Sequence, residues 1–302
     1  MLRQATWLLR RTNGRAFTKL PRIVGLSDPS LGLLAPAPAG THTSVVRFGG
    51  FIGELVRGPG VSGQDNGSLV LYFHGGGFFS CGLRSHRRLV ARISTAADVP
   101  VLNVDYRQLP QATLAQSIDD CVHAYHLMLL RGYRADQIVL AGDSAGGYLA
   151  FAVALRAAKL GLPVPAGIAA LAPWLDLECT HSRVHPNGFT DPYLPVRRVG
   201  QILGLLYGNS APVEPLLEAD LSSLPPTLIQ VSSIEALLSD AELMTDRLAL
   251  AGVPVRLQIW QRQVHVFQAI ADLVPEGFAA IDQIGRFVAD QLAEAAAEAP
   301  AA

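Results

Sequence analysis

The sequence Ile138-Val139-Leu140-Ala141-Gly142-Asp143-Ser144-Ala145-Gly146-Gly147 sets a serine between an apolar run and a helical pattern that continues from Tyr148. An apolar run, a Gly-x-Ser-x-Gly turn and a helix, in that order, predict a strand–turn–helix with the serine hydroxyl exposed at a strained apex. The residues beside the serine must be small because backbones crowd there, and Gly142 and Gly146 meet this demand. Ser144 is therefore a candidate nucleophile.

A second glycine-rich segment, His74-Gly75-Gly76-Gly77, ends another apolar run at residues 69–73. Glycine N–H groups in such a loop can point at an oxygen that gains negative charge during a reaction. Two glycine-rich turns without any chemistry are the alternative interpretation. Because both motifs follow apolar runs directly, the pair favours a catalytic site built from both loops.

Short apolar runs alternate with helical patterns along most of the chain. The runs are nearly continuous in apolar residues, which is typical of strands buried on both faces of a parallel sheet. They cover residues 68–73, 99–105, 137–141, 167–172, 227–232 and 255–260, and the helical patterns cover 85–97, 114–131, 145–160, 238–251 and 276–295. Two earlier runs, 43–48 and 52–57, predict a hairpin at the sheet edge. The 302 residues are thus expected to form a single α/β domain with a mostly parallel sheet flanked by helices.

Residues 178–219 interrupt this alternation with several prolines among scattered apolar residues. Connections of this length inside a compact domain rarely lack secondary structure, so we predict a helical lid here. Residues 1–19 are basic and contain no long apolar stretch, which argues against a secretory signal. A helix packed on the lid is the expectation for them, and contact with a membrane surface is the alternative.

A serine hydroxyl needs a base to take its proton, and three histidines follow Ser144: His181, His185 and His265. His265 lies just beyond the last apolar run, in a loop that can reach the carboxyl end of the strand before Ser144. His181 and His185 fall in the predicted lid. Their spacing could hold a metal ion on a helix, but no third ligand is apparent, so we expect solvated side chains.

The acid that orients the base should follow the apolar run 227–232, since the order in this type of site is serine, acid, histidine. Glu235 falls in the loop just past that run, and Asp240 falls near the first turn of the next helical pattern. A carboxylate at the start of a helix is favoured by the helix dipole, which is a sufficient structural reason for Asp240. Glu235 is therefore the predicted acid, with Asp240 as the alternative.

Composition excludes several classes of protein. The net charge is −1, so no overall field favours nucleic acid. Three scattered cysteines, Cys81, Cys121 and Cys179, indicate neither a disulfide framework nor a thiolate zinc site, and a reducing cytoplasm is the expected compartment. No apolar run approaches the roughly 20 residues that a membrane span needs.

Taken together, the motifs resemble those of the hormone-sensitive-lipase-like family of α/β-hydrolase carboxylesterases. The resemblance spans roughly residues 45–288 and rests on His74-Gly75-Gly76-Gly77, Asp105-Tyr106-Arg107, Gly142-Asp143-Ser144-Ala145-Gly146-Gly147, Ala172-Pro173-Trp174-Leu175-Asp176-Leu177, Leu224-Pro225-Pro226 and His265-Val266-Phe267. It implies an α/β-hydrolase fold, a lid built from residues 1–43 and 178–219, and no cofactor or metal. It also implies an oxyanion hole made by the backbone amides of Gly76, Gly77 and Ala145.

Two departures from the family pattern concern the acid and one loop. The acid position usually carries aspartate, and here it is Glu235. After Asp105-Tyr106-Arg107 the family commonly reads Leu-Ala-Pro-Glu, whereas this chain reads Gln108-Leu109-Pro110-Gln111. We expect Asp105, Tyr106 and Arg107 to brace the oxyanion loop from below. Phe78, Phe79 and Trp174 could line the substrate pocket or belong to the core.

The expected activity is hydrolysis of short to medium acyl esters by a Ser144, Glu235 and His265 triad through an acyl-enzyme. A lactone hydrolase with the same mechanism is one alternative. A non-catalytic small-molecule receptor on the same fold is another, although the complete set of three residues argues against it. Residues 252–260 could also pair across the edge of a homodimer.

Overall fold

An eight-stranded sheet forms the centre of the computed structural model, which describes residues 28, 36–63, 67–191, 193–194, 196–198, 200–208 and 212–298. The strand order is β1-β2-β4-β3-β5-β6-β7-β8. The strands are β1 (His42–Arg47), β2 (Ile52–Arg57), β3 (Leu69–Phe73), β4 (Val101–Asp105), β5 (Ile138–Asp143), β6 (Gly167–Leu171), β7 (Thr227–Ser232) and β8 (Val255–Trp260).

All strand pairs from β4 to β8 are parallel, and only the edge hairpin β1–β2 and its pairing with β4 are antiparallel. The predicted edge hairpin and mostly parallel sheet are therefore confirmed. Strands β3, β5, β6 and β7 are buried along their whole length, as their continuous apolar sequences require.

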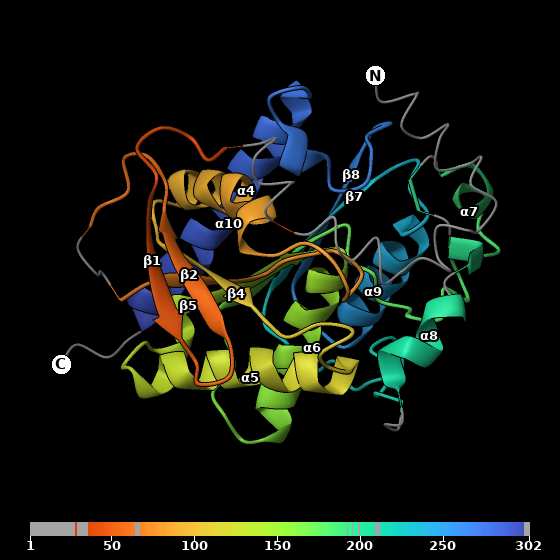
Figure 1. The fold of residues 1–302 in the computed structure, drawn as a ribbon, viewed down its shortest axis with the longest axis horizontal. Coiled ribbons are helices and arrows are strands. Elements are labelled where there is room, and N and C mark those ends of the chain that lie inside the picture. The colour runs from red at the N-terminus through yellow and green to blue at the C-terminus, as the bar shows by residue number, and fades with distance from the viewer. Residues whose placement is uncertain are drawn as a thin grey trace.

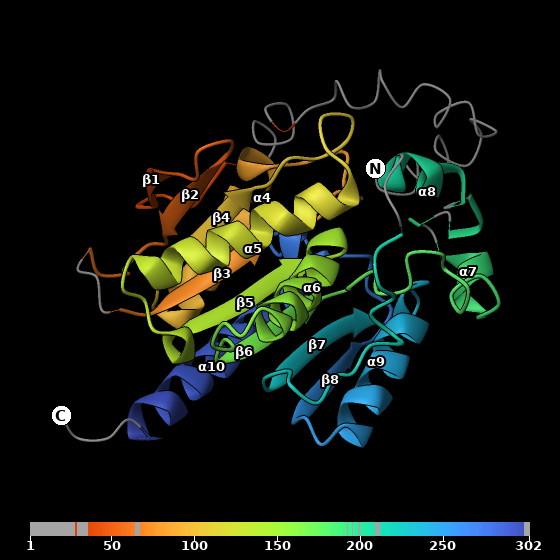
Figure 2. The same ribbon diagram turned by 90° about the horizontal axis from the view of Figure 1, so that it is seen from below.

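Helices cover both faces of the sheet (Figures 1 and 2). Helices α4 (Leu83–Ala97) and α10 (Pro275–Glu298) pack on one face, where Val70, Val139 and Leu228 join their core. Helices α5 (Leu114–Leu130), α6 (Ala145–Lys159) and α9 (Leu238–Leu250) pack on the other. The two separate cores explain why the central strands have no polar face.

The insertion between β6 and β7 is partly helical, as the sequence predicted. It contains α7 (Asn187–Thr190), the 3₁₀ turn η3 (Val196–Arg198) and α8 (Gly200–Tyr207), all at the right of Figure 2. Two further 3₁₀ turns, η2 (Ala135–Gln137) and η4 (Phe267–Ile270), precede β5 and follow the His265 loop. The part of the predicted lid in residues 1–43 lies outside the described residues, apart from Asp28 and residues 36–43.

Asp28 caps the start of α4. Its carboxylate oxygens accept the N–H groups of Arg84, at 2.9 Å, and Ser85, at 2.6 Å. These amides have no partner within a helix, and a negative charge there is favoured by the helix dipole. The cap residue of α4 is Gly82, which has no side chain to do this, so a residue far earlier in the chain supplies the acceptor.

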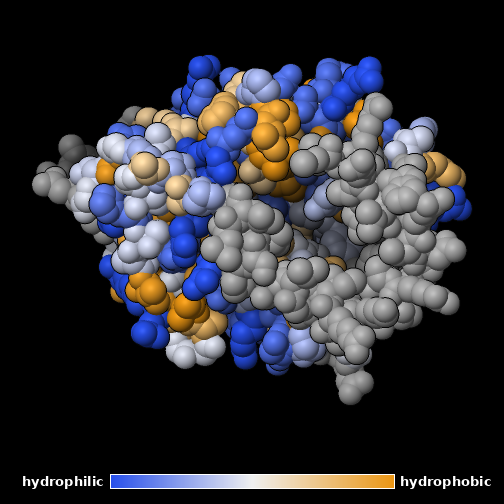
Figure 3. All heavy atoms as spheres, turned by 45° about the horizontal axis from the view of Figure 1, so that its top comes forward, coloured by the Kyte–Doolittle hydropathy of each residue, from blue (hydrophilic) through white to orange (hydrophobic). Residues whose placement is uncertain are grey.

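Within the described residues, no helix combines the length and the apolar character that a bilayer crossing demands. The molecular face in Figure 3 mixes apolar patches with hydrophilic side chains. Large exposed apolar side chains include Leu130, Val184, Leu250 and Leu273, which belong to different parts of the fold. Single exposed apolar residues of this kind are normal for a protein surface.

A close approach of α10 to α4 provides a test of the packing. A Cβ atom at Gly285 of α10 would overlap the carbonyl oxygen of Ala96 at the end of α4. Gly285→Ala should therefore lower the free energy of unfolding by about 1–2 kcal/mol, since overpacking outweighs the gain in helix propensity. Gly204 of α8 has no atom near its Cβ position, so Gly204→Ala should be neutral or stabilise by up to about 1 kcal/mol. Urea unfolding of both variants measures this, and equal stabilities would contradict the packing.

Candidate active site

Ser144 sits at the apex of the turn between β5 and α6, as the sequence predicted. Its backbone has φ 53° and ψ −118°, a conformation that costs energy for a residue with a side chain. The Ser144 N–H donates to the carbonyl of Leu171 at 2.9 Å, and its own carbonyl accepts the N–H of Trp174 at 3.0 Å. The neighbouring strand β6 and the loop after it thus hold the strained turn in place.

The glycines around Ser144 are required by the backbone of β3. A Cβ at Gly146 would overlap the carbonyl oxygen of Phe73, and a Cβ at Gly142 would overlap the carbonyl oxygen of Gly146. The turn therefore presses directly against the end of β3, where the oxyanion loop begins. This contact places Ser144 beside the segment His74–Gly77 in space.

The oxyanion loop has an unusual backbone. Gly76, Gly77 and Phe78 are consecutive residues with positive φ, at 118°, 65° and 66°. Successive residues of this kind direct N–H groups to one side and form anion-binding concavities. The N–H groups of Gly76, Gly77 and Ala145 make no hydrogen bond to any other described residue. Three amide donors are thus left available beside Ser144.

Glu235 and His265 are brought into direct contact. The Glu235 Oε2 atom lies 2.6 Å from Nδ1 of His265, and Glu235 Oε1 accepts the N–H of Ser232 at 2.6 Å. Both side chains are nearly fully buried. The contact fixes which ring nitrogen of His265 carries the proton and leaves Nε2 for exchange with another group.

Burial by itself would lower the pKa of His265, because it disfavours the charged ring. The hydrogen bond and the charge of Glu235 outweigh burial, and the charges of Asp191 and Asp143 add to them, so the pKa of His265 lies above its ordinary value. No hydrogen bond joins the Ser144 hydroxyl to the His265 ring in this structure. Such bonds are often long in free enzymes and shorten in the substrate complex.

Val266, the residue after His265, has a left-handed backbone with φ 51°. A β-branched residue in this region is a rare outlier, and such strain is typical of functional sites. The ring of Tyr193, from the insertion, lies 5.7 Å from the ring of His265. His265 is therefore held by its own strained loop, by Glu235 and by one aromatic residue of the insertion.

The profile of the alpha/beta hydrolase fold matches residues 70–269, which include the two glycine-rich loops, Glu235 and His265. Carboxylesterase/phospholipase LipF of Mycobacterium tuberculosis is 41% identical over 293 residues, covering 94% of this chain and 78% of LipF. Esterase LipU of the same organism is 42% identical over 274 residues, covering 87% of this chain and 92% of LipU.

The chain belongs to the hormone-sensitive-lipase-like family of α/β-hydrolase carboxylesterases. A solved esterase of the bacterial hormone-sensitive lipase family superimposes with a TM-score of 0.82 at 35% identity, covering 91% of this chain and 98% of that one. Human hormone-sensitive lipase is 40% identical over 134 residues. The protein is therefore an ester-hydrolysing enzyme.

Asp143 of this esterase connects its two glycine-rich loops, a role that the sequence analysis missed. Its Oδ1 atom accepts the hydroxyl of Tyr72 at 2.7 Å and the N–H of Gly75 at 3.0 Å. His86 of α4 pairs with the same carboxylate at 3.2 Å. Although burial opposes both charges, the pairing lowers the pKa of Asp143 and raises that of His86. The sequence did offer one signal for this role, because Asp143 is an acidic residue in a turn that was expected to be buried.

The residues expected to brace the oxyanion loop do so in part. The Tyr106 hydroxyl donates to the carbonyl of His74 at 2.7 Å, directly under the loop. Arg107 forms a two-pronged contact with Asp120 of α5, at 2.9 and 2.7 Å. The Asp105 carboxyl makes no hydrogen bond to another described residue, and burial raises its pKa to about 6.

The aromatic residues near the motifs of the esterase divide into two groups. Phe78 is buried in the core, with its ring 5.9 Å from Tyr148 and 5.8 Å from Trp174. The Phe79 ring instead lies close to Gly77, one of the predicted amide donors. Phe78 and Trp174 are thus core residues, and Phe79 is the one in contact with the predicted amide donors.

His181 and His185 of the insertion have separate partners. His181 Nδ1 lies 3.2 Å from Asp176 Oδ2, and His185 Nδ1 accepts the N–H of Asn187 at 3.2 Å.

Cys81, next to the oxyanion loop, is largely buried, and burial raises the pKa of its thiol to about 11. The thiol is therefore a poor nucleophile at neutral pH.

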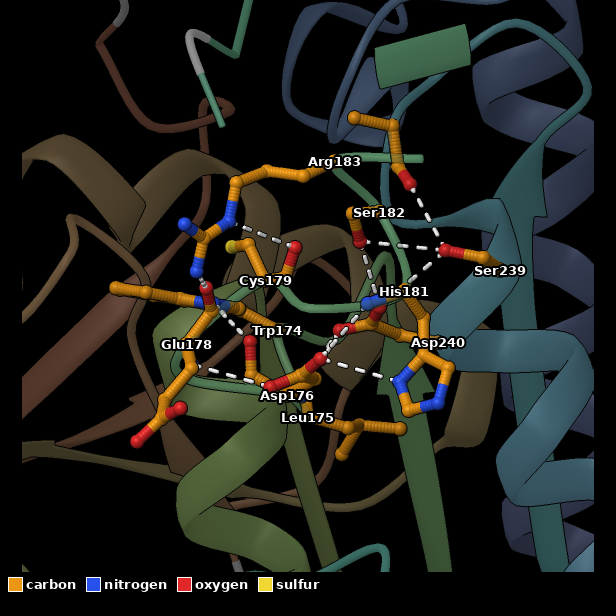
Figure 4. Close-up of polar contacts among 11 residues, drawn as sticks. Trp174, Leu175, Asp176, Glu178, Cys179, His181, Ser182, Arg183, Ser239 and Asp240 are labelled. Atoms are coloured by element: carbon orange, nitrogen blue, oxygen red, sulfur yellow. Dashed lines mark hydrogen bonds and ion pairs between the residues drawn. The ribbon is translucent and has the colours of Figure 1, made fainter. Parts of the chain in front are cut away.

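Asp240, the alternative acid, reaches the start of the insertion and not His265 (Figure 4). Its Oδ2 atom accepts the N–H groups of Leu175, at 3.1 Å, and Asp176, at 2.9 Å, and Oδ1 accepts the Ser182 hydroxyl at 2.7 Å. Asp240 therefore ties the first turn of α9 to the loop after β6. Its position in the first turn agrees with the expectation from the helix dipole, and its contacts give it a second structural role.

The stability of the protein should depend on pH through Asp240. Burial raises the pKa of its carboxyl to about 6, above the unfolded value of about 3.9. The native state thus binds this proton more tightly. The contribution of Asp240 to the free energy of unfolding is therefore greatest below about pH 4, falls as the pH rises from about 4 through 6, and levels off above that.

The free energy of unfolding of the wild type, minus that of Asp240→Asn, should therefore fall by about 1–3 kcal/mol between about pH 4 and pH 7. Urea unfolding at several pH values measures this difference. Glu242→Gln, at an exposed position of the same helix, is the matched control. A difference that grows with pH would show the opposite sign and contradict the assignment.

Proposed function

We propose that the protein hydrolyses carboxylic esters through a covalent acyl-enzyme formed on Ser144. His265 takes the hydroxyl proton while Ser144 Oγ attacks the ester carbonyl, and the same proton then passes to the departing alcohol. Water next attacks the acyl-enzyme, again with His265 as base, which releases the acid and restores the serine. Each step uses only the protein, the ester and water.

The observation that carries this proposal is the 2.6 Å contact between Glu235 and His265. A buried carboxylate on Nδ1 holds the ring in the tautomer that can accept a proton at Nε2, and it stabilises the imidazolium that follows. The amides of Gly76, Gly77 and Ala145 are the proposed donors to the tetrahedral oxyanion. Their lack of another partner among the described residues supports this role.

Ser144→Ala should reduce kcat by about 10⁴-fold or more while the fold survives, because the nucleophile is lost and the remaining site gives only residual catalysis. Hydrolysis of p-nitrophenyl butyrate and labelling by a p-nitrophenyl phosphonate measure activity and serine reactivity. Circular dichroism serves as the control for folding. A correctly folded variant with near-native turnover would rule out Ser144 as the nucleophile.

The two carboxylates near the site can be separated by isosteric variants. Glu235→Gln should lower kcat by about 10⁴-fold, since the imidazolium loses its negative partner. Asp240→Asn should lower kcat far less than Glu235→Gln does and should lower the melting temperature, because its contacts are with Leu175, Asp176 and Ser182. The two variants are controls for each other, and a reversed pattern of activity would assign the acid to Asp240.

Residues 1–43 and 178–219 are proposed to form a lid that limits the length of the acyl chain. An enclosed site of about 300–1,000 Å³ accommodates short to medium chains and gives no interfacial activation. A series of p-nitrophenyl esters, with a lactone and a phospholipid added because LipF is named a phospholipase, tests this preference. A jump in activity on emulsified long-chain triglyceride would contradict it.

The free edge of β8 is the proposed site of homodimer formation, through residues 252–260. β8 is the last strand of the sheet, and an unpaired edge is a template for pairing with another strand. A cytoplasmic location is also proposed, in keeping with the three free cysteines, Cys81, Cys121 and Cys179. Size-exclusion chromatography tests the dimer.

A further inference from the structure

Two side chains of the insertion hold the backbone of the loop that carries Glu235. Asn187, the first residue of α7, donates from Nδ2 to the carbonyl oxygens of Ser233 and Glu235, both at 3.0 Å. Asp191, just after α7, accepts the N–H of Ala236 on Oδ2 at 2.6 Å. The insertion therefore forms hydrogen bonds to this loop at three residues: Ser233, Glu235 and Ala236.

Asp191 also orders its own segment. Its Oδ1 atom accepts the N–H groups of Tyr193, at 2.7 Å, and Leu194, at 2.9 Å. Tyr193 is the residue whose ring lies over His265. One carboxylate thus connects the loop of the acid to the aromatic residue beside the base.

The end of β8 and the loop that carries His265 hold the other side of this loop. The Ser232 hydroxyl donates to the carbonyl of Gln263 at 2.6 Å. The Ser233 N–H donates to the carbonyl of Trp260, and the Arg262 N–H donates to Ser233 Oγ, both at 2.9 Å.

The N–H of Glu235 reaches the carbonyl of Ser232 only at 3.4 Å, and the N–H of Leu238 reaches the carbonyl of Glu235 at 3.2 Å. Side chains in an active site must stay within about 0.5 Å of the productive geometry, which requires a rigid surrounding shell. From the insertion, Asn187 and Asp191 supply the hydrogen bonds to Glu235 and to Ala236, the residue after it.

The insertion is itself anchored where it begins. Figure 4 shows Ser182 bonded to Asp240, which also holds the amides of Leu175 and Asp176. Asn187 follows Ser182 by five residues, so the segment that bonds to the acid loop begins close to a residue attached to α9. Helix α9 therefore helps to fix the position of Asn187.

We propose that Asn187 and Asp191 are positioning residues that orient the Glu235–His265 pair from the insertion. This inference rests on the proposed function, and it assigns the insertion a part in catalysis beyond enclosing the substrate. The rival explanation is that the same bonds only stabilise the fold.

A double-mutant cycle separates the two explanations. Asn187→Ala removes both donors and should lower kcat about 3- to 10-fold with KM nearly unchanged, as expected for the loss of one or two hydrogen bonds that act through Glu235. In the Glu235→Gln background the same change should cause no further loss of the rate of Ser144 phosphonylation. An equal loss in both backgrounds would overturn the proposal.

Thr190→Ala is the matched control, because Thr190 lies in the same short helix and its hydroxyl reaches only the carbonyl of Pro186. It should keep wild-type kcat. All variants are assayed well below their melting temperatures. A loss of melting temperature for Asn187→Ala, with kcat equal to that of the control, would show a purely structural role.

The pH profile of kcat/KM gives a second test, because a purely structural role of Asp191 would leave this profile unchanged. The charged or titratable groups that act on His265 are Glu235, Asp191 and Asp143, and the phenol of Tyr193 lies over its ring. Asp191→Asn removes a negative charge that favours the imidazolium, so the acid limb of kcat/KM should move to lower pH. An unmoved limb would overturn the role of Asp191.

Failure of the proposed function has a different signature. It would appear as a folded wild-type protein that hydrolyses no ester and whose Ser144 does not react with the phosphonate. Failure of the positioning role alone would leave the wild type active and labelled, with Asn187→Ala and Asp191→Asn indistinguishable from it in kcat and in pH profile.

Discussion

The buried carboxylate of Asp143 is the interaction on which the geometry of the site depends. It accepts the amide of Gly75 and pairs with His86, so it joins the nucleophile turn, the oxyanion loop and α4 at one point. A Cβ at Gly75 would overlap this carboxylate, so the first glycine of the His-Gly-Gly-Gly motif is required by Asp143, whereas the next two are the proposed oxyanion donors. The carboxylate of Asp143 therefore holds both glycine-rich loops of the site.

A second buried carboxylate, that of Glu235, organises the other half of the site. Asp143 and Glu235 each pair with a histidine, but the two pairs have different surroundings. His86 is enclosed by α4 and the sheet, whereas His265 lies under a residue of the insertion, Tyr193. The first pair belongs to the rigid core, and the second lies where the core meets the insertion.

Much of this arrangement could be predicted from the sequence. The eight strands and five long helices follow from apolar runs and helical periodicity. The position of Glu235 in the loop just past β7, with Asp240 already explained by the helix dipole, predicted Glu235 as the partner of His265. The contacts of Asp143 with His86 and of Asn187 with the acid loop could not be predicted. They join residues 57 and 46–48 positions apart, and no periodicity links such residues.

The strand order has a consequence for how the enzyme is made. Strands β3 to β6 and the helices between them carry both Ser144 and the amides beside it, whereas Glu235 and His265 follow β7 and β8 at the edge of the sheet. Domains begin to fold while the chain leaves the ribosome, N-terminal parts first. Under the proposed mechanism, the nascent protein holds Ser144 without its base until His265 emerges, so ester hydrolysis would begin only after β8 has been made.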